Sequence, residues 1–357
     1  MNRPAFSWGE PTRLAGLPSL WKRAILAGLA LLIAWGLSLA PGLPTGQPGA
    51  GDADLYRAVA ARVHNGEPYH RAAAAEQRHR GYPVRPFTTM REPLLAEIGA
   101  TIGPRTADLL LILLGIGAAL ATGMRLFHEL RSPVREVALT LAASSVGLLA
   151  MPGMWVWHEL WAGVLVALAL ACRSDRHWGL AVLFGLVAAL IREFALPLLP
   201  LMAFAALLSH RRQEAIGWAA ASLVAVAALA GHAVAATEAA GVGGAVSPGW
   251  VAFGGWGFDL LLARHCAVLL LLPPQAAAIA LPLALLGWAA WRSDYALRVT
   301  LMLATWLAAF LIVGRPDNDY WGFLLLPTLP IGLALAPAAL RDLLAPAPGG
   351  NRAPALA

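Results

Sequence analysis

Long apolar stretches alternate with short polar segments along almost the whole chain. A helix needs about 20 mostly apolar residues to cross the hydrocarbon core of a bilayer, and somewhat fewer when flanking residues reach the interface. Ten stretches meet this requirement, at roughly 24–40, 106–127, 137–152, 159–172, 178–191, 195–209, 216–236, 275–291, 298–313 and 322–340. The pattern predicts an all-α, polytopic integral membrane protein with about ten transmembrane helices. Residues 1–357 then form a single transmembrane domain.

Composition supports this prediction. Hydrophobic residues make up 59% of the chain and charged residues 13%, and the mean hydropathy is +0.65. A soluble domain would have too few polar residues to cover its surface. The formal net charge of +6 is spread without a dense basic tract, which favours contact with membrane lipids and argues against nucleic-acid binding.

The arginines predict an orientation, because short cytoplasmic loops collect Lys and Arg. With the N-terminus inside, most of them fall on the cytoplasmic side, from Arg13, Lys22 and Arg23 to Arg341 and Arg352. The short turns predicted on the outer side hold one arginine each, namely Arg192, Arg264 and Arg315. We therefore expect a multi-pass protein of a bacterial inner membrane with both termini in the cytoplasm.

Residues 41–105 are then the first extracytoplasmic loop, and they are unusually polar. The loop carries eight arginines, Arg57, Arg62, Arg71, Arg78, Arg80, Arg85, Arg91 and Arg105. This excess suggests an anionic ligand. Alternatively, the six acids of the loop simply offset the arginines on solvated helices. Apolar residues at helical spacing over 55–63 and 91–102 predict short interfacial helices that roof a cavity.

Several chemistries lack their usual signals. The nine histidines and two cysteines form no Cys-x-x-Cys or His-Glu-x-x-His motif, so no metal ligands are predicted, and the need for a divalent metal stays open. The Gly-rich segments 241–244 and 254–257 lack a following Lys-Ser/Thr pair, which argues against nucleotide binding.

The order of motifs in the first loop resembles a known family. After the first apolar stretch come Asp52-x-x-x-Tyr56, an apolar helix, and Gly66-Glu67-Pro68-Tyr69. This order is similar to that of polytopic glycosyltransferases of the GT-C superfamily, in the bacterial branch that takes sugar from polyprenyl-phosphate carriers. Segments 155–161, 191–197 and 318–321 also fit. Residues 89–94, Thr-Met-Arg-Glu-Pro-Leu, depart from the Tyr-Pro-Pro-type element of many relatives.

The resemblance implies transfer of sugar from a polyprenyl-phosphate donor to an envelope lipid or glycan acceptor. Such a reaction needs a carboxylate that accepts the proton of the acceptor hydroxyl and cations that stabilise the leaving phosphate. Asp52 is the first candidate for this base, since it precedes Tyr56 by one helical turn, and Asp54 is the second. The alternative for either is an N-cap on a helix over 55–64.

Further candidates for substrate contact lie in the first loop and at predicted helix ends. Glu92 either lines a cavity or caps the next helix, Arg192 either binds substrate or pairs with Glu193, and His158 and Glu159 either line a cavity or belong to an interfacial tryptophan belt. The complete set of binding candidates is Tyr56, Arg57, Tyr69, Arg91, Glu92, His158, Glu159, Arg192, Arg315, Asn318 and Tyr320.

Two other functions use the same residues differently. In a transporter or flippase for an anionic lipid or glycan, the arginines bind cargo and the carboxylates couple to protons. A non-catalytic partner in an envelope-polysaccharide complex needs neither carboxylate. Transport predicts ionisable residues deep inside spans, whereas the candidates here cluster at helix ends, so the sequence favours chemistry at the membrane surface.

Overall fold

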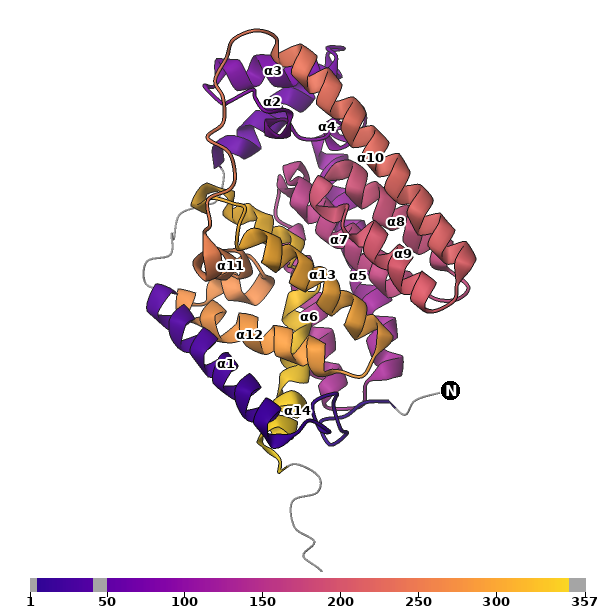
Figure 1. Cartoon of the computed structure of the whole chain (residues 1–357). Coiled ribbons are helices and arrows are strands. Elements are labelled where there is room, and N and C mark those ends of the chain that lie inside the picture. Colours follow the sequence, from indigo (N-terminus) through magenta and orange to yellow (C-terminus); the bar gives the residue numbers. More distant parts are fainter. Residues whose placement is uncertain (1–4, 41–49, 347–357) are drawn as a thin grey trace, which may run out of the picture.

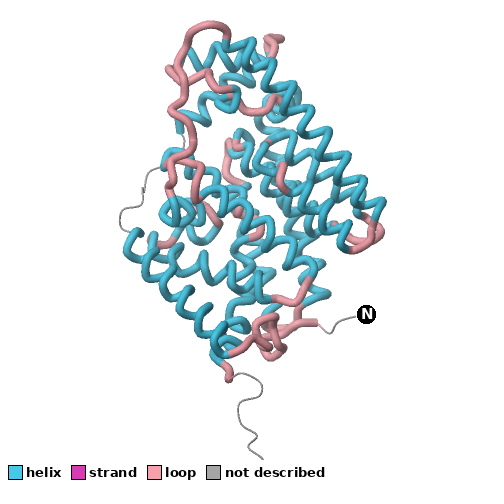
Figure 2. Tube along the Cα trace, in the orientation of Figure 1, coloured by secondary structure: helices cyan, strands magenta, loops and turns pink. Residues whose placement is uncertain are grey.

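The structure is a computed structural model that describes residues 5–40 and 50–346. This part of the chain is helical and contains isolated β-bridges but no strand (Figure 2). The α-helices are α1 Ser19–Leu39, α2 Ala50–His64, α3 Tyr69–His79, α4 Leu94–Ile102, α5 Pro104–Glu129, α6 Val134–Leu149, α7 His158–Cys172, α8 Trp178–Ile191, α9 Leu198–Leu208, α10 Arg212–Ala240, α11 Gly255–Ala263, α12 Pro274–Ala290, α13 Asp294–Phe310 and α14 Gly332–Leu344. Short 3₁₀ helices join them: η2 Phe87–Thr89, η3 Met154–Val156, η4 Glu193–Ala195, η5 Ala267–Leu271, η6 Pro316–Leu324 and η7 Leu329–Ile331.

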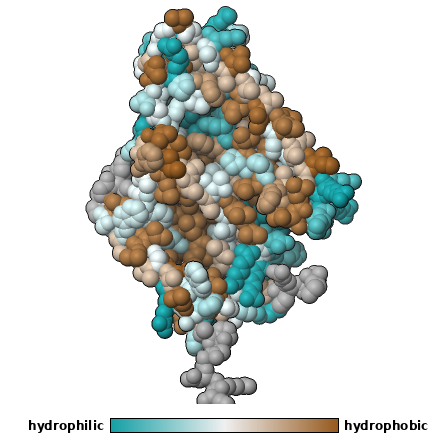
Figure 3. All heavy atoms as spheres, viewed as in Figure 1, coloured by the Kyte–Doolittle hydropathy of each residue, from teal (hydrophilic) through white to brown (hydrophobic). Residues whose placement is uncertain are grey.

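Within the described residues, three helices are long and apolar enough to cross a membrane, namely α1, α5 and α10. Their apolar side chains are largely on the outside: Leu31 of α1 is 70% exposed and Leu223 of α10 is 73% exposed. Apolar residues are spread over the body of the face in Figure 3, and the most hydrophilic ones lie toward its upper and lower ends and at its right edge. Such a surface suits contact with lipid rather than water. The all-α prediction is therefore confirmed, together with three membrane-length helices.

Nine of the ten predicted apolar stretches coincide with one α-helix each. The tenth, 322–340, is wrong as a continuous helix. Its residues divide among η6, η7 and α14, and the segment 329–344 makes an angle of 70° with η6. The two segments form a fourth candidate span only if they cross the membrane together as one bent unit. Pro327 and Pro330 lie at this break, where each lacks the N–H that a continuing helix requires.

Helix α7 forms the centre of the body. All its residues except Cys172 are buried, as expected for a helix that is apolar on every side. A side chain at Gly163 would place its Cβ 2.9 Å from the carbonyl oxygens of Phe323 and Leu324. Glycine at this position therefore allows η6 to lie directly against α7.

Helices α2, α3 and α4 form a roof at one end of the body (Figure 1). The roof is held by α10, whose 29 residues span about 44 Å, well beyond a hydrocarbon core of about 30 Å. Arg78 of α3 donates to the carbonyl oxygens of Ala239 and Ala240 at the end of α10, at 3.0 and 2.6 Å. The segment after α10 pairs with residues 84 and 85 through backbone hydrogen bonds.

Helices α2 and α4 are present where the sequence predicted two short helices, and their interfacial location stays a prediction; α3 was not predicted. Helix α2 begins at Ala50, so Asp52 and Asp54 lie inside it and the capping alternative for these two residues is wrong. Residues 41–49 of the predicted loop and Arg352 lie outside the described residues. The described ends of the chain pack together opposite the roof, where the Thr12 backbone N–H donates to Asp342.

Candidate functional site

A chain of hydrogen bonds joins the roof to the membrane body. The Arg91 guanidinium donates from Nη2 to the Tyr320 hydroxyl at 2.8 Å, and that hydroxyl donates to Oδ2 of Asp52 at 2.7 Å. The three residues come from the loop before α4, from η6 and from α2. A cation and a carboxylate are thus bridged by one phenol, across more than 200 residues of sequence.

Arg91 is held from several sides. It is 8% exposed, its carbonyl oxygen accepts a hydrogen bond from the Tyr69 hydroxyl at 2.6 Å, and its guanidinium lies 5.8 Å from the centre of the Tyr56 ring. Burial raises the pKa of Tyr56 to about 12, although Arg91 opposes the shift. Tyr56 is therefore a neutral hydroxyl at physiological pH.

A second arginine lies behind the first. Arg192, between α8 and η4, is 1% exposed, donates from Nε to Oε1 of Glu159 at 2.7 Å and pairs with Glu193. The same oxygen of Glu159 lies 3.9 Å from Nη2 of Arg91. One buried carboxylate therefore lies between two guanidinium groups. The predicted Arg192–Glu193 pair is present, but as part of a larger cluster.

Glu92 adds a third acid. It is 6% exposed, and its carboxyl group lies beside that of Glu193. Burial and the adjacent Glu193 charge raise the pKa of Glu92 well above the ordinary value, because two carboxylates at this distance cannot both ionise cheaply. Pro93, not Glu92, is the N-cap of α4, so the capping alternative is wrong for Glu92; nor does Glu92 line the pocket under the roof.

His158 completes the cluster. Its ring lies 5.1 Å from that of Tyr56, edge to face, and the residue is 3% exposed. Neither ring nitrogen has a hydrogen-bond partner. The same is true of Nε of Arg91, Oε2 of Glu92, Oε2 of Glu159 and Nη2 of Arg192. Buried polar atoms are rarely unpartnered, so their concentration here makes this cluster the candidate site for a polar ligand.

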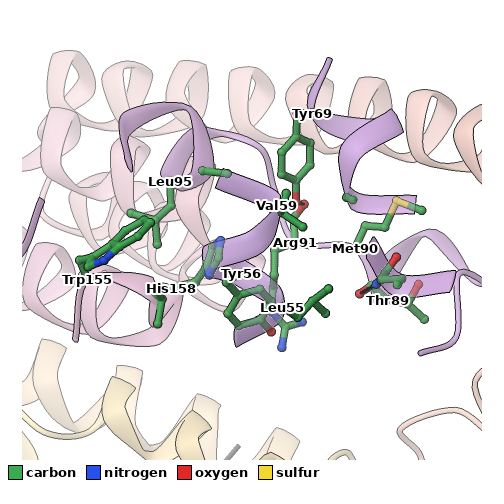
Figure 4. Close-up of a pocket in the computed structure, with 14 residues that line it drawn as sticks. Leu55, Tyr56, Val59, Tyr69, Thr89, Met90, Arg91, Leu95, Trp155 and His158 are labelled. Carbon is green, nitrogen blue, oxygen red and sulfur yellow. Dashed lines mark hydrogen bonds between the residues drawn. The ribbon is translucent and has the colours of Figure 1, made fainter. Parts of the chain in front are cut away.

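Part of this cluster faces a pocket under the roof. The pocket is partly open to solvent and has a cavity volume of about 20 Å³, enough for one or two water molecules. Figure 4 shows Arg91 near its centre, with Tyr56 and His158 on one side and Thr89 on the other. Apolar walls come from Leu55, Val59, Leu95 and Trp155. Apolar walls with a few converging polar groups are typical of small-molecule sites.

The remaining candidates lie apart from this centre. Asp54 and Arg57 form a surface ion pair at 2.8 Å, with 63% and 46% of their side chains exposed. Arg315 pairs with exposed Asp317 at 3.0 Å, and the Asn318 side chain accepts a hydrogen bond from the Arg315 backbone. Asn318 therefore shapes the start of η6, the element that carries Tyr320.

Sequence reasoning missed Gln77 and Thr89, two polar residues that line the pocket. Gln77 faces inward from α3, a helix that was not predicted. The available signal was weak: one glutamine four residues after Ala73 and eight after Tyr69, on the same face of a helix.

No metal site is evident in residues 5–40 and 50–346, where no group of three or more His, Cys, Asp or Glu side chains is arranged to hold an ion. Comparisons with protein-family models, with curated proteins and with solved structures each found no match. Any assignment of function must therefore come from the fold and from this site.

Proposed function

We propose that this protein is a membrane glycosyltransferase. It moves a sugar from a polyprenyl-phosphate donor to an envelope lipid or glycan acceptor on the extracytoplasmic side of a bacterial inner membrane. The observation that carries the proposal is the convergence of Asp52, Arg91 and Arg192 near one another through Tyr320 and Glu159. These three residues were chosen from sequence for the base and for the phosphate cations, and they come from three separate parts of the chain.

The proposed roles follow from charge and exposure. Asp52 is half-buried at the edge of the cluster, where it accepts the proton of an acceptor hydroxyl as that oxygen attacks the sugar. Arg91 and Arg192 are buried and stabilise the negative charge on the lipid phosphate as it leaves. The lipid reaches the site between the roof and the body. In this proposal all ten apolar stretches cross the membrane and both termini lie in the cytoplasm.

The test is sugar transfer by the purified protein reconstituted in lipid. Asp52→Asn keeps the size of the side chain but removes the proton acceptor, and loss of a general base lowers the rate by about 100- to 10,000-fold. Asp54→Asn is the matched control, because exposed Asp54 pairs only with Arg57 at the surface and should transfer sugar at nearly the normal rate. Near-normal turnover of Asp52→Asn would refute the role of this residue.

One observation favours the alternative, a proton-coupled transporter for an anionic lipid. The buried Glu92–Glu193 pair is a group that could take up and release a proton. The two functions differ in their products. A transporter moves the labelled lipid across the bilayer of a vesicle and leaves the sugar attached, whereas the transferase releases free polyprenyl phosphate.

A further inference from the structure

A second cavity lies at the end of the body opposite the roof, between the last turns of α5 and the segment that joins α7 to α8. Its volume is about 740 Å³, which is within the range of sites that hold a whole small molecule. Its lining on α5 starts at Ala121, about 25 Å along the helix axis from Pro104, where α5 leaves the roof. No residue of the cluster around Arg91 lines this cavity, so the proposed function does not account for it.

The cavity wall changes from apolar to polar along α5 and α8. Ala121 and Met124 precede the last turn of α5, and Leu180 lies in the first turn of α8. The polar residues lie nearer the helix ends or in the joining segment: Arg125, His128, Glu129, Ser174 and His177. A membrane lipid has the same polarity, because its headgroup is level with the ends of spanning helices and its chains run alongside them.

The cavity opens on a surface that suits lipid. Met124 and Leu180, which line it, are exposed, and so are Leu120 and Phe127 of α5. Helix α5 is long and apolar enough to cross a membrane. In a bilayer, lipid chains cover an exposed apolar surface of this kind, so the bilayer itself supplies an occupant for the cavity.

The acidic group of the cavity, Glu129, is held in place but keeps unused acceptor positions. Its carboxylate accepts hydrogen bonds from the Ser293 hydroxyl at 2.5 Å and from Nη1 of Arg125 at 3.4 Å. The second contact is long, since charge-assisted hydrogen bonds are typically about 2.7–2.9 Å. Arg125 also donates to the carbonyl oxygen of Ala171 at the end of α7, at 3.1 Å. A carboxylate has about four acceptor positions, so Glu129 can accept from a further cationic donor.

Donors for an anion line the same cavity. His128 and His177 each carry at least one N–H group in every protonation state, and Ser174 carries a hydroxyl. Oγ of Ser174 accepts from the backbone N–H of His177 at 3.1 Å and lies 3.1 Å from Nδ1 of its ring, which holds the imidazole beside the hydroxyl. The lining therefore combines hydrogen-bond donors for phosphate oxygens with one carboxylate for a cation.

We propose that this cavity binds a membrane phospholipid with a primary-amine headgroup, namely a phosphatidylethanolamine. Its ammonium group donates to Glu129, its phosphate accepts from the two histidines and Ser174, and an acyl chain lies against the apolar wall. The Arg125–Glu129 pair carries both signs of charge and no net charge, and so does this headgroup. An anionic headgroup would meet the Glu129 carboxylate without a compensating cation, and a quaternary ammonium has no N–H group to donate.

The experiment titrates the full-length protein in detergent with lipids of identical acyl chains and measures binding by native mass spectrometry. Phosphatidylethanolamine should bind about tenfold more tightly than phosphatidylcholine, the effect of one additional hydrogen bond to a charged group. Phosphatidylglycerol, which is anionic, should also bind more weakly than phosphatidylethanolamine. A wild type that binds either of these two lipids at least as tightly as phosphatidylethanolamine would overturn the inference, whatever the variants do.

The variant Glu129→Gln tests the ammonium contact. It should lose the preference for phosphatidylethanolamine and change the affinity for phosphatidylcholine less than twofold. The matched control is Glu136→Gln, because exposed Glu136 pairs with Arg135 on α6 and does not line the cavity. Glu136→Gln should keep the preference. A preference that survives in Glu129→Gln would overturn the proposal, and if this variant does not fold, the comparison of lipids on the wild type still decides.

The variant Leu180→Trp tests the acyl chain. It should weaken binding of all three lipids by about tenfold, because the indole takes the place of about two methylene groups of the chain. Leu183→Trp is the control, since Leu183 is exposed on the same helix but does not line the cavity. Normal binding to Leu180→Trp, or equally tight binding of soluble glycerophosphoethanolamine, would overturn the assignment to a lipid. These measurements do not depend on sugar transfer, so this proposal and the proposed function fail separately.

Discussion

Removing a single oxygen, in Tyr320→Phe, tests whether the phenol positions Asp52. The Tyr320 hydroxyl makes two hydrogen bonds to charged partners, Arg91 at 2.8 Å and Asp52 at 2.7 Å. Bonds to charged groups contribute about 1.5–3 kcal/mol each. Asp52 is half-buried and can bond to water instead, and Arg91 keeps Glu159 nearby at 3.9 Å. We therefore expect a net loss close to that of one bond.

A loss of about 1.5–3 kcal/mol in the transition state corresponds to a kcat that is roughly 10- to 150-fold lower. Lipid binding should change less than twofold, because the phenol is proposed to orient the base and not to hold the phosphate. The assay measures kcat and lipid affinity separately for the reconstituted protein. Tyr295→Phe is the control, since Tyr295 is fully buried in the first turn of α13 and makes no contact with the cluster. A parallel loss of binding and kcat, or no loss of either, would refute a positioning role.

Three other changes have defined outcomes. The folded protein holds a proton on Glu92 that the unfolded chain releases, so the stability of the wild type should fall as pH rises above about 4.5. Glu92→Gln should therefore become progressively more stable than the wild type between pH 5 and 8, as measured by thermal unfolding. A difference in stability that does not change with pH would contradict this. Gly332→Ala should lower the free energy of unfolding by about 1–3 kcal/mol or more, because the new Cβ would lie 2.1 Å from a carbonyl oxygen of α12. Gly28→Ala is the control: its Cβ meets no atom within 4 Å, so the change should be tolerated. In His79→Cys, the new thiol at this exposed position should react with a membrane-impermeant thiol reagent added to the extracytoplasmic side. If the thiol does not react in intact cells, the proposed topology is wrong.

Much of the fold could be predicted because apolar length is a strong signal. The helices α5 and α10 follow directly from uninterrupted runs of apolar residues. The break near Pro327 and Pro330 was overlooked, although proline marks it, because the surrounding residues are as apolar as those of a spanning helix. Helix α11 was missed because its nine residues are too few to stand out.

The candidate site was predictable in its residue types and less so in its contacts. Charged residues at helix ends beside a membrane are rare unless they have a function, so Arg91, Glu159 and Arg192 could be chosen from sequence. Their partners could not, because Tyr320 meets Asp52 across 268 positions and only the tertiary fold sets that distance. Gln77 escaped notice because a polar residue on a polar surface helix is ordinary until the helix is known to face inward.

The energetics of the cluster argue against a purely stabilising role. Burying ion pairs such as Arg192–Glu159 costs desolvation energy that their attraction barely repays, and apolar residues of similar volume often stabilise a protein more. Here the cost is raised further by unpartnered atoms on Arg91, Glu92 and Arg192. An arrangement this unfavourable in the free protein is improved by a ligand that supplies the missing partners.

The depth of these charges then favours surface chemistry over transport. In α5 the Asp, Glu and Arg residues occur only within the first five and the last five positions, and in α10 within the first three and the last three; the one histidine inside α10, His232, lies eight residues before its roof end. The acids and arginines of the cluster likewise lie in the roof or at the roof-facing ends of α7 and α8. A pathway for protons or anions across the membrane needs ionisable groups at intermediate depth, whereas a transferase needs them only where the lipid headgroup lies. The distribution of charge in α5, α10 and the cluster therefore supports the glycosyltransferase proposal over the transporter.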